Sequence, residues 1–178
     1  MSGTGRAAEV LTKGRRTVDI LWAPWRMEYV QRVDTKDDVC IFCEKPKQET
    51  DRENLILYRG KTVFVILNKY PYNNGHLMVV PYGHTSDIAA LEDRAALEMW
   101  QLTNKCKAVL SKAFHPDGYN IGMNIGRTAG AGIDQHIHMH IVPRWNGDTN
   151  FMPIVGQTKV VSQALMETYD ALAPHFRD

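Results

Sequence analysis

The sequence of 178 residues contains no apolar run of about 18 residues, the length that a membrane-spanning helix needs. Residues 1–16 are polar and basic and lack the apolar core of a secretory signal. The 21 lysines and arginines nearly balance the 20 acidic residues, so no overall charge favours nucleic acid or a membrane surface. Three cysteines are too few for a disulfide framework in a chain of this length. These absences predict a cytoplasmic protein with neither membrane nor nucleic acid as its partner.

Residues 1–17 are mostly small, polar and basic, which predicts a flexible tail. Residues 18–178 are expected to form one domain, because 44% of the chain is apolar and no linker-like segment divides it. The N-terminal arm of this domain carries Trp22 and Trp25 beside Pro24, a residue that can open a helix. We expect the arm to dock on the domain or on a second subunit.

The apolar pattern predicts both strands and helices. Strands are expected at residues 55–58, 62–67, 76–80 and 119–125, between turn-forming segments. A long helix is expected at 92–114, where a buried stripe at helical spacing is formed by Ala96, Trp100, Thr103, Cys106 (or Lys107) and Leu110. Cys106 lies in this stripe, so a packing role is expected for it and not a reactive thiol. A C-terminal helix is expected at 160–172. Strands in hairpin-like order with helices between or after them predict an α+β fold with an antiparallel sheet.

The stretch at 135–143 reads Q-H-I-H-M-H-I-V-P and places His136, His138 and His140 at every second position. In a β-strand this spacing puts the three imidazoles on one face, about 7 Å apart, with apolar residues on the other. The alternative is a half-buried strand whose polar face is rich in histidine by chance. Because three of the seven histidines fall within five residues, we predict that this stretch is the active site.

A glycine-rich loop, residues 126–134, precedes the histidines. Gly126, Gly130 and Gly132 allow positive φ and a close approach of the backbone to a ligand, and successive N–H groups in such a loop can bind an anion. Asn124 and Arg127 add neutral and cationic donors. Imidazole is a competent nucleophile at neutral pH, and the sequence contains no Walker-type phosphate loop. The combination predicts covalent catalysis at phosphorus by a histidine.

Cys40 and Cys43 form a C-x-x-C pair in a turn-rich segment. Two thiolates at this spacing can bind Zn²⁺, although redox dithiols and buried cysteines without metal share the pattern. Structural zinc needs four ligands, and histidine is the other common donor. Spacing alone does not choose between the remaining candidates, which are His76, His84, His115, His175 and one histidine of the 136–140 cluster.

These motifs resemble those of the histidine triad (HIT) superfamily. The residues from His136 to Val142 match the pattern His-φ-His-φ-His-φ-φ, in which φ is apolar. Upstream, N-x-x-P-x-x-x-G-H-x-x-V-x-P at residues 68–81 matches the strand-turn-strand of the family. The segments L-W-A-P-W-R-M-E-Y and A-G-A-G-I-D-Q-H-I-H-M-H-I-V-P-R-W-N-G-D-T-N-F-M-P resemble the prokaryotic branch related to diadenosine polyphosphate hydrolases and phosphorylases. The likeness covers residues 20–172.

The resemblance implies a HIT-like α+β fold, with an antiparallel sheet of about five strands, that forms a homodimer and binds nucleotides of the adenosine polyphosphate type. It also implies cleavage of diadenosine polyphosphates, such as diadenosine tetraphosphate, through a covalent nucleotidyl-histidine. Alternatives are phosphorolysis in place of hydrolysis, a nucleoside phosphoramidase, or a regulatory module that binds nucleotide without using turnover.

The resemblance also implies individual roles. His138 would be the nucleophile, with His140 near the phosphates and His76 supporting the triad from a neighbouring strand. Substrate would be bound by Asn68 near the ribose, by Asn124, Gly132, Ile133 and Arg127 near the phosphates, and by Ile41, Phe42, Ile66 and Met78 around the purine. The zinc ligands would be Cys40, Cys43, His84 and His136.

One segment departs from the family pattern. Many members carry serine, threonine or glutamine two to four residues before the first triad histidine, where this chain has Gly132-Ile133-Asp134-Gln135. We expect Asp134 to be a solvated loop carboxylate, so that phosphate contacts fall mainly to backbone N–H groups, His140 and Asn124.

Overall fold

A five-stranded antiparallel sheet with the strand order β1-β2-β3-β5-β4 forms the centre of the fold. The computed structural model describes residues 39–148 and 164–177. The strands are β1 (Ile56–Arg59), β2 (Val63–Leu67), β3 (Leu77–Pro81), β4 (Gly118–Gly122) and β5 (Met139–Arg144). Every residue of β2 and β3 is buried, which explains why their sequences, V-F-V-I-L and L-M-V-V-P, are apolar throughout and do not alternate.

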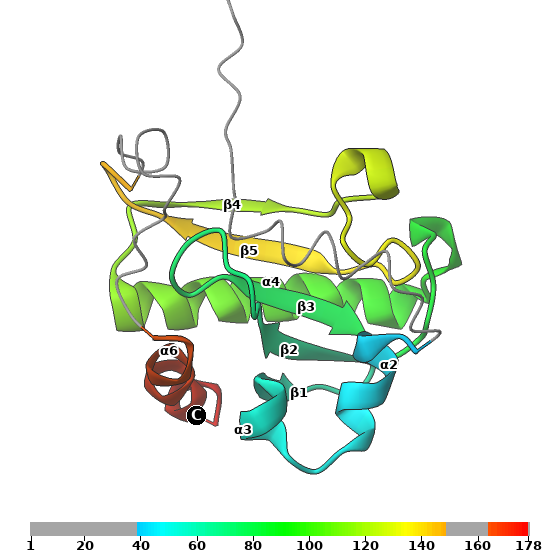
Figure 1. Cartoon of the computed structure of the whole chain (residues 1–178), viewed down its shortest axis with the longest axis horizontal. Coiled ribbons are helices and arrows are strands. Elements are labelled where there is room, and N and C mark those ends of the chain that lie inside the picture. The colour runs from blue at the N-terminus through cyan, green and yellow to red at the C-terminus, as the bar shows by residue number, and fades with distance from the viewer. Residues whose placement is uncertain (1–38, 149–163, 178) are drawn as a thin grey trace, which may run out of the picture.

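Short and long helices surround the sheet. They are α2 (Ile41–Glu44), η2 (Lys45–Lys47), α3 (Asp51–Asn54), η3 (Ile88–Ala90), α4 (Asp93–Phe114), η4 (Arg127–Ala129), α6 (Leu165–Leu172) and η5 (Ala173–Phe176). The long helix α4 lies along one face of the sheet, against β2, β3 and β5 (Figure 1). The short helix α2 lies beside the C-terminal end of β3 (Figure 1).

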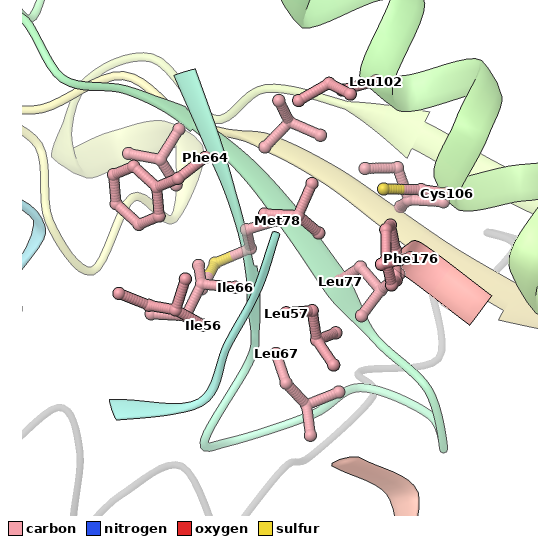
Figure 2. Packing of buried hydrophobic residues seen from close by; sticks show 14 of the residues in the cluster. Ile56, Leu57, Phe64, Ile66, Leu67, Leu77, Met78, Leu102, Cys106 and Phe176 are labelled. Atoms are coloured by element: carbon pink, nitrogen blue, oxygen red, sulfur yellow. The ribbon is translucent and has the colours of Figure 1, made fainter. Parts of the chain in front are cut away.

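The core divides between the two faces of the sheet. Leu102 and Cys106 of α4 lie on one side of it, and Ile66 and Met78 lie on the other with Ile56 (Figure 2). Cys106 is completely buried, and burial raises the pKa of its thiol. The packing role expected of this cysteine is therefore confirmed.

A row of residues crosses the sheet on the face away from α4. Ile56 pairs with Ile66, Ile66 with Met78, and Met78 with His140. Directly paired residues on neighbouring strands project from the same face. The register therefore aligns apolar side chains of β1, β2 and β3 with a histidine of β5, and this face carries the candidate site.

Most predicted elements are confirmed, with shifted boundaries. The strand expected at 135–143 is right only from Met139 onward, and the stripe expected on the long helix is wrong in its first half. Trp100 is 59% exposed and Ala96 is also exposed, whereas Ala95 and Met99 are buried. The prediction is correct again at Thr103, Cys106 and Leu110.

The remaining predictions concern the ends of the chain. The C-terminal helix is confirmed from Leu165 to Leu172. The flexible tail at 1–17, the arm with Trp22 and Trp25, and residues 160–163 lie outside the described residues. In the part of the chain that the structure describes, no helix has the length and apolarity required to cross a bilayer.

Candidate active site and metal site

The three histidines of the 136–140 cluster lie where β5 begins. Only His140 belongs to β5, since the strand starts at Met139. The preceding residues leave the ladder at the end of β3: the backbone N–H of Ile137 donates to the carbonyl of Thr85 at 2.8 Å, and the side-chain Nε2–H of His136 donates to the carbonyl of Pro81, the last residue of β3, at 2.9 Å. The rings of His138 and His140 still lie side by side, with their centroids 4.7 Å apart.

A hydrogen bond fixes the orientation and the tautomer of the His138 ring. Its Nδ1 lies 2.8 Å from the backbone carbonyl of His136. A carbonyl oxygen only accepts, so Nδ1 carries the proton and Nε2 keeps a lone pair in the neutral ring. His138 is 5% exposed, and burial lowers its pKa, which favours this neutral form. The arrangement supplies the unprotonated nitrogen that an attack on phosphorus requires.

Two successive hydrogen bonds determine the tautomer of His140. The backbone N–H of Tyr72 donates to Nδ1 of His76 at 3.1 Å, so neutral His76 carries its proton on Nε2. That nitrogen lies 2.9 Å from Nδ1 of His140, which accepts a hydrogen bond from it. His140 therefore carries its own proton on Nε2, as a donor to phosphate would need. Tyr72 also stacks on His76, with ring centroids 5.0 Å apart.

Four side chains from three segments form a candidate metal site. Cys40, Cys43, His84 and His136 present ligand atoms that all lie within 4.8 Å of one another. Nδ1 of His136 lies 3.3 Å from the Cys40 sulfur and 3.6 Å from the Cys43 sulfur, and Nδ1 of His84 lies 3.3 Å from the Cys43 sulfur. Donors around tetrahedral zinc are separated by roughly 3.3–3.8 Å, given the usual Zn–S and Zn–N bond lengths.

The protonation states of this site also fit a metal ion. Nε2–H of His136 donates to Pro81, which leaves Nδ1 available as a ligand. Burial lowers the pKa of His136 and so favours the neutral ring. Burial and the adjacent Cys40 raise the pKa of the Cys43 thiol, a cost to ionisation that a divalent cation would offset. The spacing and donor chemistry therefore fit Zn²⁺ in a Cys₂His₂ site.

The residues expected around the purine lie in different environments. Ile66 and Met78 occupy the row that leads to His140 and are 2% and 7% exposed. Phe42 is 2% exposed and contacts the rings of His136 and His138, whereas Ile41 beside it is 47% exposed. The structure thus brings Phe42 to the histidines and leaves Ile41 at the surface.

The expected ribose residue and the glycine loop are also located. Asn68 accepts a hydrogen bond from the N–H of Tyr70 at 2.9 Å, which forms a local turn just after β2. Asn124 donates to the carbonyl of Gly130 at 3.5 Å and so closes the glycine loop. Gly132 and Ile133 are half-buried.

The charged residues of the loop differ from expectation in one respect. Arg127 is at the surface, and its Nε lies 4.0 Å from a carboxylate oxygen of Asp134. The side chain of Asp134 is 37% exposed, so it is a loosely paired carboxylate and not merely a solvated one.

Three groups that support the histidines are not predicted by any sequence motif. Tyr72 provides both a backbone donor and a ring for His76, and the carbonyls of Pro81 and Thr85 hold the segment before β5. A backbone carbonyl is present in every residue, so the amino-acid type does not indicate which carbonyls support the site. The only available indication for Tyr72 was an aromatic residue in a turn just ahead of a buried histidine.

These features are those of a histidine-triad nucleotide-binding domain, and comparison with known proteins agrees. Residues 49–147 match the model of the HIT domain, so the chain belongs to the HIT family. It is 42% identical over 160 residues to a protein of Mycobacterium tuberculosis named AP-4-A phosphorylase, a match that covers 86% of this chain and 82% of the relative.

Solved structures agree with the fold. A zinc-bound histidine triad family protein from Mycobacterium smegmatis superposes with a TM-score of 0.63 at 26% identity, covering 79% of this chain and 94% of that one. A protein from Sulfolobus tokodaii, described as a hypothetical histidine triad nucleotide-binding protein, gives a TM-score of 0.61 at 29% identity, covering 78% and 89% of the two chains.

Proposed function

We propose that this protein cleaves diadenosine polyphosphates, such as diadenosine tetraphosphate, through a nucleotidyl intermediate on His138. The observation that carries the proposal is the hydrogen bond from Nδ1 of His138 to the His136 carbonyl, which leaves Nε2 unprotonated. The similarity to the AP-4-A phosphorylase of M. tuberculosis supports the choice of substrate.

The reaction proceeds in two displacements at the α-phosphorus. In the first, Nε2 of His138 forms a P–N bond while the bond from phosphorus to the bridging oxygen breaks, and the polyphosphate departs with the electron pair. Nε2–H of His140 donates a hydrogen bond to the phosphate oxygens. The hydrogen bond from His76 to Nδ1 of His140 keeps the proton of that ring on Nε2. In the second displacement, an oxygen nucleophile attacks the phosphorus and the P–N electron pair returns to Nε2.

We propose inorganic phosphate as the second nucleophile, because the relative at 42% identity is named a phosphorylase. With diadenosine tetraphosphate the first step releases ATP and leaves AMP on His138. Attack by phosphate then gives ADP, whereas attack by water gives AMP. Incubation with and without phosphate, followed by identification of the nucleotides, separates the two outcomes; AMP formed equally in both would refute phosphorolysis.

A His138→Ala variant tests the nucleophile. It is expected to bind nucleotide and to lose turnover by several orders of magnitude, because alanine cannot form the P–N bond of the proposed intermediate. Titration calorimetry and steady-state kinetics on the same preparation measure the two properties. Turnover equal to that of the wild type would refute the assignment.

We further propose that Cys40, Cys43, His84 and His136 bind one structural Zn²⁺. The convergence of their ligand atoms supports this site. Such an ion would tie the segment before β1 to the segment before β5, far apart in sequence. A cytoplasmic location would keep the two thiols reduced and able to bind metal. Elemental analysis of protein purified without added zinc tests the site, and fully reduced protein without metal would refute it.

We also propose that the protein is a homodimer. Within the described residues, β4 ends the sheet and pairs only with β5. Exposed apolar side chains lie on α4 and β4, namely Leu97 and Trp100, each 59% exposed, and Ile121, 41% exposed. Sedimentation equilibrium of the wild type and of Trp100→Glu tests the proposal: a dimer weakened by the charge is expected, and a monomeric wild type would refute it.

A further inference from the structure

Phe42 occupies an unusual position, inside the metal-binding C-x-x-C segment and against the nucleophile. It is the only buried residue of α2. Its ring centroid lies 5.0 Å from that of His138 and 5.5 Å from that of His136. One side chain therefore contacts both the residue that would attack phosphorus and a ligand of the candidate metal site.

The segment that carries Phe42 depends on its surroundings for its position. α2 is a helix of four residues, too short to be stable by itself. Its turn is closed by the N–H groups of Cys43 and Glu44, which both donate to the carbonyl of Cys40. Beyond these local bonds, the two sulfurs lie against His84 and His136. A metal ion shared by these side chains would fix α2, and with it the ring of Phe42, relative to the triad.

His138 is held from three directions. The His136 carbonyl accepts its Nδ1 proton, the ring of His140 lies 4.7 Å away, and the ring of Phe42 is the third contact. Without Phe42 the imidazole would lose an apolar neighbour and gain room for water, and both changes favour other rotamers. In a rotamer that breaks the bond from Nδ1 to the His136 carbonyl, the tautomer is no longer fixed.

We propose that Phe42 is a positioning residue that couples occupancy of the Cys40–Cys43–His84–His136 site to the orientation of His138. The proposal rests on the proposed role of His138 as nucleophile. It gives Phe42 a role in the support of catalysis, in addition to the purine contact that the family resemblance implies. The two roles predict different kinetics: loss of a positioning residue lowers kcat, whereas loss of a purine contact raises KM.

The test compares Phe42→Ala with Phe42→Leu, which keeps most of the buried volume, and with Phe176→Ala as a matched control. Phe176 is 1% exposed and packs near Tyr58, so it undergoes the same chemical change away from the triad. Metal content, kcat and KM are measured on each protein. Nitrogen NMR of labelled histidine records the tautomer of His138 in metal-loaded and chelated protein, independently of turnover.

We expect Phe42→Ala to keep its metal and to lose about 10–100-fold in kcat, as a misplaced reacting group would, whatever the change in KM. Phe42→Leu should recover most of the loss, and Phe176→Ala should keep kcat. The single His138 tautomer should give way to a mixture both in Phe42→Ala and in chelated wild type. Unchanged kcat and tautomer in metal-loaded Phe42→Ala would refute the coupling, as would a rise in KM alone or an equal loss in Phe176→Ala. A wild type that does not cleave dinucleotides would refute the proposed function, and the NMR comparison would still judge the coupling.

Discussion

Replacing Asp148 with asparagine is expected to destabilise the protein at neutral pH and much less in acid. The carboxylate of Asp148 accepts hydrogen bonds from Nε and Nη2 of Arg144 at 2.6 and 2.8 Å and from Nδ2 of Asn73 at 2.7 Å. The backbone N–H of Trp145 adds a fourth at 3.2 Å. These bonds join the end of β5 to the turn that leads into His76, so their loss would loosen both segments of the site.

The magnitude follows from the pKa of this group. The hydrogen bonds from Arg144 hold the pKa of Asp148 at about 2, against an ordinary value of 3.8. That difference corresponds to about 2.4 kcal/mol of folding free energy at neutral pH. The side chain of Asp148 is 9% exposed but that of Arg144 is 42% exposed, and solvent screening around the arginine reduces the expected contribution to about 1–2 kcal/mol.

Because folding lowers this pKa, the contribution of Asp148 to the free energy of unfolding decreases as the pH falls. The contribution is complete above the unfolded pKa near 3.8 and disappears as the pH falls from there to about 2. Urea denaturation of wild type and Asp148→Asn at pH 7, 5, 4 and 3, at constant metal content, should give a difference that is constant at the two higher values and shrinks at the lower ones. At pH 7 the midpoint of thermal unfolding should fall by about 2–8 °C.

Asp170→Asn provides the control for this experiment. Asp170 accepts two hydrogen bonds from Arg52 with similar distances, 3.0 and 2.7 Å, but both side chains are more than half exposed. An exposed pair contributes little, so this variant should destabilise the protein less than Asp148→Asn. A loss in Asp148→Asn that is the same at pH 3 and pH 7, or no greater than the loss in Asp170→Asn, would refute the reasoning.

Three further predictions concern the metal, the triad and a turn. Cys43→Ser should lose the bound ion and unfold at a lower temperature, as elemental analysis and thermal unfolding would record; a full complement of metal would contradict the ligand set. His76→Phe keeps a buried ring but removes the hydrogen bond to His140, so kcat should fall about tenfold in steady-state assays. An unchanged kcat would show that this hydrogen bond is dispensable. Gly75 has φ of 72°, and a Cβ there would lie 3.0 Å from a methyl carbon of Leu110; Gly75→Ala should cost about 1–3 kcal/mol in urea denaturation, and a neutral effect would contradict this.

Much of the fold could be predicted because its signals are local. The apolar runs of β2 and β3 are bounded by turn residues, and α4 ends at Phe114, just before His115 and Pro116. The expected stripe is wrong at Ala96 and Trp100 because α4 turns Ala95 and Met99 inward and leaves the large ring of Trp100 exposed. The packing of α4 instead buries Met99, an adaptable side chain that fits irregular spaces.

The candidate site was predictable in its residues but only partly in its geometry. Spacing identified the histidine cluster, and the family resemblance chose His84 and His136 from five open candidates for the metal. A strand over the whole stretch is wrong because the residues before Met139 leave the ladder with β3. The backbone N–H of Ile137 donates to Thr85, which lies beyond the end of β3, and the side chain of His136 donates to the carbonyl of Pro81, the last residue of β3. Such tertiary partners, like the contact of Phe42 with His138, depend on packing that no local pattern records.

The central claim is that His138 carries the nucleotide during turnover. The direct measurement is to mix the protein with diadenosine tetraphosphate, quench in base, under which a phosphorus–nitrogen adduct survives, and map the digest by mass spectrometry. We expect one adenylyl group on the peptide that contains His138, absent from His138→Ala and increased in abundance when phosphate is withheld. Turnover at the wild-type rate with no adduct, or with the adduct on another residue, would contradict it.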